Sequence, residues 1–259
     1  MPVFFSGSLF NTNKLLSAFL GLISFCLISS AIYIFNDYRD IEKDKNHPTK
    51  KNRPLASGKI KPVKALIIMA LCVVLSISIS LYLNNMQGIF CLFLYLILNI
   101  FYSIGLKDRP IIDVIILASG FVIRLFFGGF ITDVPISKWL YLVVVMGSLY
   151  MGLGKRRNEL KKQTDSREVL KYYNYSFLDK NMYVCVALAN VFYALWTIEI
   201  PDSKMIWTVP MFIIILMCYS LDIEGNSDGD PTEVILKDKT LILLVIIYVI
   251  IVFGMLYFI

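Results

Sequence analysis

The sequence has 259 residues, of which 58% are hydrophobic, and a formal net charge of +6. Soluble domains are nearer half apolar. Here the apolar residues form long blocks, which excludes an ordinary soluble protein and predicts a polytopic membrane protein. All five cysteines fall inside those blocks without a CxxC pair, which argues against a zinc site or a disulfide framework.

Eight apolar runs approach the length of about 20 residues that a membrane-crossing helix needs. The first run lacks a small-residue cleavage site, so we expect a retained span rather than a signal peptide. Strands of a β-barrel would alternate in polarity instead of running continuously apolar. The sequence therefore predicts an all-α, polytopic transmembrane helix bundle, formed as a single domain by residues 1–259. The runs are residues 15–35, 63–83, 88–105, 111–130, 139–153, 182–198, 205–221 and 241–259.

The polar segments between these runs are strongly asymmetric. Residues 36–62, 106–110, 154–180 and 222–240, with Lys64 at the first boundary, carry 21 of the 25 Lys and Arg residues. Under the positive-inside rule these four segments are cytoplasmic loops of a protein in the inner (plasma) membrane. A transporter needs access from both sides. The asymmetry favours an enzyme whose central cavity and active site face the cytoplasm.

The first of these loops holds the most informative pattern, Asn-Asp-x-x-Asp-x-x-x-Asp. Asp37, Asp40 and Asp44 are spaced three and then four residues apart, so a continuing helix would stack them on one face. Like charges there repel, and a hard cation such as Mg²⁺ would hold them together. Lys50 and Arg53 follow among other phosphate-seeking cations. A solvated, basic topology loop is the alternative, but it does not require three aligned aspartates.

The loop at residues 154–180 begins with a second charged cluster. Lys155, Arg156 and Glu159 stand at a predicted helix end, where they could face one pocket, and we expect Lys155 and Arg156 to bind phosphate. The stretch that follows, KKQTDSREVLKYY, has the pattern of an amphipathic helix resting on anionic membrane lipids. For that stretch a solvated or lipid-contacting role is favoured over catalysis.

Other candidate residues lie farther along the chain. Asp222 and Glu224 open an acidic loop, either a second wall of the metal and phosphate site or a solvated turn. Tyr102 and Lys107 stand at a helix end within reach of a phosphate. Arg124 lies in the middle of a predicted span, where a charge is costly and indicates a functional or paired role.

Four segments together carry a family resemblance: SSAIYIFNDYRDIEKDKNHPTKKNRPLASG, YSIGLKDRPIIDVIILASGFVIRLFFGG, GSLYMGLGKRRNEL and YSLDIEGNSDGDPTEVILKDK. They resemble the UbiA-type intramembrane prenyltransferase superfamily, and within it the decaprenyl-phosphate phosphoribosyltransferase branch. The resemblance covers nearly the whole chain in order, and it implies nine helices around a central cavity, where this chain offers eight. The family's basic-aromatic opening does not precede Pro2, so we expect either a truncated start or a chain that dispenses with the first helix.

The resemblance also implies an activity. The enzyme would move 5-phosphoribose from phosphoribosyl diphosphate (PRPP) to a polyprenyl phosphate, releasing diphosphate with the help of Mg²⁺. No general base is needed, because the acceptor phosphate is already an anion. The implied roles are metal binding for Asp37, Asp40 and Asp44; catalysis for Asp37, Asp40, Asp222 and Glu224; and substrate binding for Asn36, Lys50, Arg53, Tyr102, Lys107, Arg124, Lys155, Arg156 and Glu159.

Two alternatives stay open at this point. A true prenyltransferase would use the same first motif to move a prenyl group from its diphosphate to an aromatic or glyceryl acceptor. Against it, Asp222 is followed four residues on by Asn226, not by a second aspartate. A non-enzymatic lipid carrier is the other, but few charges lie at mid-span depth. The expected partners are the two substrates and membrane lipids, with no nucleic acid; a homo-oligomer is left open.

Overall fold

The computed structural model describes residues 2–47, 50–161, 168–200, 204–225 and 231–258. Across these residues the regular structure is helical and contains no β-strand, which confirms the predicted all-α class. The short helices are α1 (Pro2–Phe5), α3 (Ile41–Lys45), η1 (Lys50–Asn52), η2 (Leu106–Asp108), η3 (Glu168–Tyr172) and α10 (Pro231–Lys237).

Seven helices among the described residues are long and apolar enough to cross a membrane. They match seven of the eight predicted runs. The eighth run, residues 139–153, lies in α7 (Lys138–Lys161), which is not among the seven. Its apolar stretch is short, and its last two turns carry charges at Lys155, Arg156, Arg157, Glu159 and Lys161. The seven are α2 (Thr12–Arg39), α4 (Pro62–Tyr82), α5 (Met86–Ile104), α6 (Ile112–Thr132), α8 (Tyr175–Glu199), η4 (Met205–Thr208) continued by α9 (Val209–Glu224), and α11 (Lys239–Tyr257).

The chain packs as two compact units. The first comprises Met1–Val3, Ser8–Ile104 and Phe126–Pro135, and the second comprises Phe4–Gly7, Gly105–Leu125 and Ile136–Ile259. Helix α6 contributes to both. The expectation of a single domain over residues 1–259 stays a prediction.

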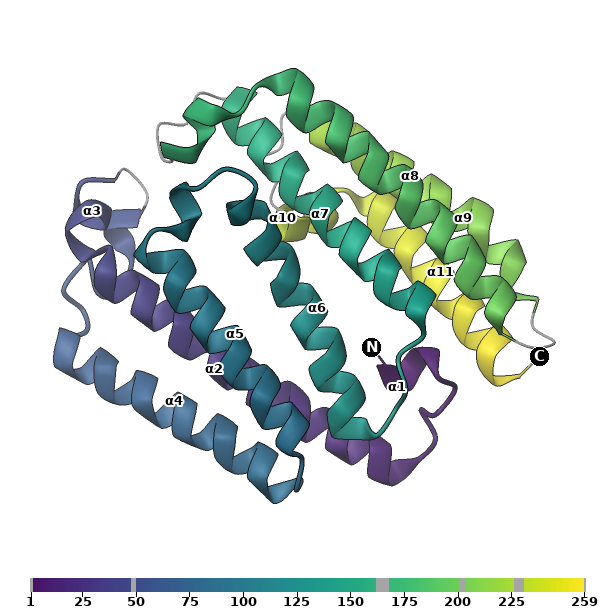
Figure 1. Ribbon diagram of the computed structural model, residues 1–259, viewed down its shortest axis with the longest axis horizontal. Coiled ribbons are helices and arrows are strands. Elements are labelled where there is room, and N and C mark those ends of the chain that lie inside the picture. The colour runs from purple at the N-terminus through teal and green to yellow at the C-terminus, as the bar shows by residue number, and fades with distance from the viewer. Residues whose placement is uncertain (1, 48–49, 162–167, 201–203, 226–230, 259) are drawn as a thin grey trace. The chain divides into compact units, whose positions relative to one another are not determined.

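In the first unit, α2, α4 and α5 pack together (Figure 1). Three buried serines join α2 to α4. The hydroxyl of Ser24 donates to the carbonyl oxygen of Ser76 over 2.9 Å, that of Ser76 donates to the carbonyl oxygen of Ser24 over 2.8 Å, and Ser80 lies 3.3 Å from Ser24. Small residues of this kind let two apolar helices approach closely, and their hydroxyls hydrogen-bond where lipid offers no partner.

In the second unit, α7 and α8 pack along much of their length, and α9 and α11 lie beside them (Figure 1). Tyr150, Met182 and Ile223 are fully buried in its main core. A Cβ atom added to Gly154 would lie 3.2 Å from Ile223 Cδ1 and 3.3 Å from Met182 Sδ. A larger residue than glycine would therefore crowd α7 against α8 and α9, just where the charged end of α7 begins.

Candidate functional site

The aspartates of the first polar segment straddle a break between two helices. Helix α2 ends at Arg39, Asp40 is both its C-cap and the N-cap of α3, and the N–H of Asp40 donates to the carbonyl oxygen of Asn36. Asp37 therefore lies in the last turn of α2, and Asp44 lies in α3. The spacing suggested one continuous helix, whereas the long helix α2 ends at Arg39 and a separate five-residue helix, α3, begins at Ile41.

Arg53 joins two of the three aspartates. Its Nη1 donates to Asp37 Oδ1 over 2.8 Å and to Asp44 Oδ2 over 2.9 Å. The Asp44 side chain is only 4% exposed, while those of Asp37 and Arg53 are partly exposed. Two carboxylates from different helices thus converge on one cationic nitrogen, and the sequence assigned all three residues to the site.

The last turn of α2 is also tied to the end of α5. The hydroxyl of Ser103 donates to Asn36 Oδ1, and the guanidinium of Arg39 donates to the carbonyl oxygen of Ser103. Tyr102 is the neighbour of Ser103 and is half-buried. In the segment that follows α3, the backbone N–H of Lys50 donates to His47 Nδ1 over 3.4 Å. The predicted residues Asn36, Tyr102 and Lys50 all belong to this first unit.

A charge network with a fully buried ion pair at its centre lies in the second unit. Arg156 Nε donates to Asp113 Oδ2 over 2.6 Å, and Arg156 Nη1 donates to Glu159 Oε2 over 2.8 Å. The Tyr173 hydroxyl donates to Asp113 Oδ1 over 2.6 Å and accepts the backbone N–H of Ile111. Burial and the bond to Asp113 raise the pKa of Tyr173 well above its ordinary value. Arg156 and Glu159 were predicted; Tyr173 was not.

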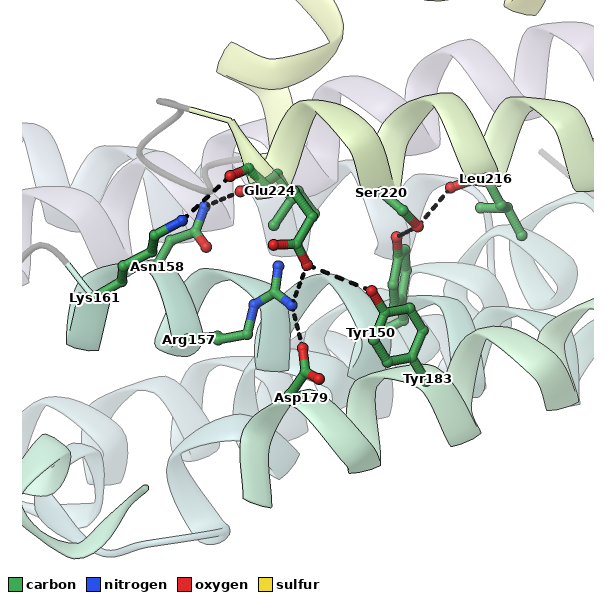
Figure 2. Close-up of polar contacts among 10 residues, drawn as sticks. Tyr150, Arg157, Asn158, Lys161, Asp179, Tyr183, Leu216, Ser220 and Glu224 are labelled. Carbon is green, nitrogen blue, oxygen red and sulfur yellow. Dashed lines mark hydrogen bonds and ion pairs between the residues drawn. The ribbon is translucent and has the colours of Figure 1, made fainter. Parts of the chain in front are cut away.

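The neighbouring Arg157 forms a second network, shown in Figure 2. Its Nη1 donates to Asp179 of α8 and to Glu224 Oε1 of α9, the latter over 2.6 Å, and its guanidinium lies 5.5 Å from the ring centre of Tyr175. The side chain is 1% exposed, yet Nε and Nη2 have no hydrogen-bond partner within the described residues. Sequence reasoning missed Arg157. The sequence did offer one signal: Arg157 directly follows Arg156, about 100° around the same helix, so it faces a different set of neighbours.

Further contacts hold the end of α9 on α7 (Figure 2). Asn158 Nδ2 donates to the carbonyl oxygen of Ile223 over 2.8 Å, and Lys161 Nζ donates to that of Glu224 over 3.3 Å. These carbonyl oxygens belong to the last turn of α9, which lacks intrahelical donors. The contacts fix the backbone on which the predicted residue Glu224 stands.

Asp222 faces another carboxyl group. Its carboxyl lies near that of Asp238, the N-cap of α11, which accepts the N–H of Thr240. Asp222 Oδ2 is buried and has no partner among the residues the structure describes. Residues 226–230, the centre of the predicted acidic loop, lie outside the described residues.

The remaining predicted residues are more scattered. Arg124 is exposed on α6, 5.6 Å above the ring centre of Phe121. Asp113, on the same helix, is fully buried and paired with Arg156. Lys107 in η2 and Lys155 in α7 are both half-buried. The structure thus places Lys155, Arg156 and Glu159 on one helix end and leaves Arg124 on an exposed face.

The donor atoms of the first unit fit a magnesium ion. No group of three or more His, Cys, Asp or Glu side chains within the described ranges could hold a metal ion by itself. Mg²⁺ usually takes one or two protein carboxylates and completes its shell with water and substrate phosphates. Asp37 and Asp44 provide two hard oxygen donors that already converge on a cation.

Comparison with known proteins assigns the chain to the same family that the four motif segments resemble. The family model of the UbiA prenyltransferase family matches residues 3–219. The chain belongs to that family. Its UbiA relatives include the decaprenyl-phosphate phosphoribosyltransferase of Mycolicibacterium smegmatis, 34% identical over 89% of this chain and 77% of the relative. The enzyme of the same name from Corynebacterium glutamicum is 34% identical over 93% of this chain and 76% of the relative.

The UbiA fold is also found among solved structures. A UbiA homolog from Archaeoglobus fulgidus, bound to GPP and Mg²⁺, matches 98% of this chain and 93% of its own with a TM-score of 0.76 and 18% sequence identity. At that identity the likeness concerns the fold alone. With seven long apolar helices among the described residues, the UbiA family member described here is a multi-pass membrane protein.

Proposed function

We propose that this protein transfers 5-phosphoribose from PRPP to a polyprenyl phosphate and releases diphosphate. The observation that carries the proposal is the similarity to two decaprenyl-phosphate phosphoribosyltransferases over nine-tenths of the chain. The Asp37–Arg53–Asp44 cluster supports it, because a diphosphate donor needs both a metal and a cation. The enzyme is a pentosyltransferase built on a prenyltransferase fold.

The first unit would bind the donor's diphosphate. Asp37 and Asp44 would hold Mg²⁺ with Asp40 beside them, while Arg53 and Lys50 contact phosphate oxygens. When bound, the metal neutralises the charge that develops on the leaving diphosphate. Arg53 exchanges its carboxylate partners for phosphate oxygens, which match its planar donors. Asn36 accepts a hydrogen bond from Ser103, which holds its side chain in place at the end of α2.

The reaction itself needs no side-chain base. The bond between C1 of the ribose and the diphosphate oxygen breaks, and diphosphate leaves with the electron pair. An anionic oxygen of the polyprenyl phosphate forms the new bond to C1. In such reactions, most of the rate enhancement comes from fixed charged groups that stabilise the charge developing in the transition state. Asp222 and Glu224 would face the ribose hydroxyls or the positive charge that develops on the ring.

The second basic cluster would contact the remaining phosphates. Lys155 is half-buried at the charged end of α7 and is the natural contact. Arg156 is enclosed between Asp113 and Glu159, so it would reach a phosphate only by exchanging one of these partners. Tyr102, Lys107 and Arg124 are assigned to substrate contact from the sequence alone. The four basic polar segments would face the cytoplasm from the plasma membrane, in keeping with the positive-inside rule.

Donor identity tests the proposal. Purified protein receives a short polyprenyl phosphate, Mg²⁺ and either ribose-labelled PRPP or a labelled prenyl diphosphate, the donor that a prenyltransferase would use. We expect label from PRPP to enter the lipid phase, and we expect EDTA to prevent this transfer; no prenyl group should be transferred from the prenyl diphosphate. Incorporation from the prenyl diphosphate alone would contradict the proposal and favour prenyl transfer.

A further inference from the structure

An open cavity of about 610 Å³ lies in the first unit, and it is lined by residues other than those assigned to the reaction. The last turn of α2, helix α3 and the segment before α4 line it, up to the first residue of α4; Ser57 and Lys59 of that segment are not among its lining residues. None of the predicted metal, catalytic or substrate-binding residues is among its lining residues. It therefore calls for a ligand of its own.

The lining of the cavity is positively charged. Arg39, Lys45 and Lys61 face one acidic residue, Glu42. Lys45 Nζ lies 2.7 Å from Glu42 Oε1, but these side chains are 48% and 84% exposed, so that ion pair is weak. Arg39 donates to a neutral carbonyl oxygen, that of Ser103, so this contact does not cancel its charge. The cavity keeps a surplus of two positive charges, which selects an anion.

The cavity also has apolar walls and stands at the membrane boundary. Leu55 is 7% exposed, Ile60 is half-buried and Tyr38 is exposed beside them. The spans α2 and α4 both end at this cavity, one by its last turn and the other by its first. An aromatic ring, aliphatic side chains and basic residues at the end of a span are the groups that meet lipid headgroups.

We propose that this cavity binds the headgroup of an anionic membrane phospholipid. The lipid phosphate lies among Arg39, Lys45 and Lys61, and its glycerol and first acyl carbons contact Tyr38, Leu55 and Ile60. The observations favour a resident phospholipid over the reacting polyprenyl phosphate, because the cavity shares no residue with the Asp37–Arg53–Asp44 cluster. The bound lipid joins residues 55–62 to α2 and α3. This inference does not depend on the proposed reaction.

Native mass spectrometry of the full chain in detergent tests this site. The probes are phosphatidylglycerol, phosphatidylcholine, a short polyprenyl phosphate and inorganic phosphate, each added separately. The variant Lys45→Gln/Lys61→Gln removes two lining charges; the matched control Lys59→Gln/Lys64→Gln removes two exposed charges of the same segment outside the lining. We expect the first variant to retain about tenfold less phosphatidylglycerol, and the control to behave as wild type.

Because Lys45→Gln/Lys61→Gln could lose lipid by misfolding, a second variant is designed to bind more lipid than wild type. Glu42→Gln removes the single carboxylate of the lining, so retention of phosphatidylglycerol should increase. Equal losses in the two double variants, or no loss in either, would overturn the proposal. Equal binding of phosphatidylcholine, or binding of only inorganic phosphate or polyprenyl phosphate, would overturn it as well.

Discussion

Arg156 and Asp113 form an ion pair in which neither side chain is exposed: Arg156 Nε lies 2.6 Å from Asp113 Oδ2. The pair joins α7 to α6 within the second unit. Glu159 and Tyr173 complete it, so every charge in the network has an opposite or hydrogen-bonding partner. Burying two charges is costly, and removing one partner leaves the other unbalanced.

Asp113→Asn should therefore destabilise the protein strongly. The substitution keeps the side chain's shape but removes one of the two carboxylates around Arg156, and such losses cost about 3–5 kcal/mol. The measurement is thermal unfolding in detergent. Asp133→Asn, at an exposed position, is the control and should stay within about 0.5 kcal/mol of wild type. Equal melting of Asp113→Asn and wild type would show that the pair does not hold α6 and α7 together.

Tyr173→Phe should cost less, because it removes a hydroxyl and no charge. The lost hydroxyl leaves Asp113 and the backbone N–H of Ile111 without this partner, at about 1–3 kcal/mol. Ile111 also has a φ of 69°, a strained conformation for a β-branched residue. Tyr172→Phe, 71% exposed, is the adjacent control. A loss equal to that of Tyr172→Phe would contradict the assigned contacts.

The same tyrosine gives a pH dependence. The pKa of Tyr173 is raised above its ordinary value of 10.0 by burial and by Asp113. Above the ordinary pKa of about 10, the tyrosine loses its proton in the unfolded chain while the folded protein still holds it. The free energy of unfolding therefore falls as pH rises above about 10. Below that pH the stabilisation is fully present. Unfolding of wild type and Tyr173→Phe, compared from pH 8 to 11, should show a steeper loss for wild type; parallel curves would contradict it.

Arg157 should act by positioning Glu224. Arg157→Gln leaves Asp179 and Glu224 without their shared cation, and the displaced Glu224 should lower kcat more than it raises the KM for PRPP. Arg157→Lys keeps the charge and should restore part of kcat. Lys171→Gln, which breaks an exposed pair with Glu168, is the control. If kcat of Arg157→Lys is no higher than that of Arg157→Gln, the positive charge at this position is not what positions Glu224.

Substitutions of Asp44 and Arg53 should change the affinity for Mg²⁺ in opposite directions. Asp44→Asn should weaken the apparent affinity for Mg²⁺, because it removes a buried carboxylate donor. Arg53→Gln should strengthen that affinity in the absence of PRPP, because Arg53 occupies the two carboxylates, while raising the KM for PRPP. Lys51→Gln, an exposed neighbour, should change neither. Magnesium titrations of activity and of binding without substrate measure both effects; an unchanged affinity in Asp44→Asn would remove Asp44 from the metal site.

The sequence predicts the spans well because long apolar runs have few alternatives to a membrane helix. The run at 139–153 does form a helix, α7, but it is not among the seven long apolar helices of the described residues, because the charged end of α7 follows a short apolar stretch. In the site, the pattern of Asp37 and Asp44 points to one cation, but it does not reveal the helix break at Asp40. Tyr173 and Asp113 are 60 residues apart, and only the packing of a loop against α6 brings them together. Arg157 was overlooked for a similar reason, since its partners come from α8 and α9.

The most direct test of the central claim follows two phosphorus labels in PRPP. One preparation carries the label in the 5-phosphate and the other in the diphosphate, and each is incubated with the protein, Mg²⁺ and a short polyprenyl phosphate. Phosphoribosyl transfer predicts that the 5-phosphate label enters the lipid phase and the diphosphate label stays in water as inorganic diphosphate. Diphosphate label in the lipid phase, or no 5-phosphate label there, would contradict the account.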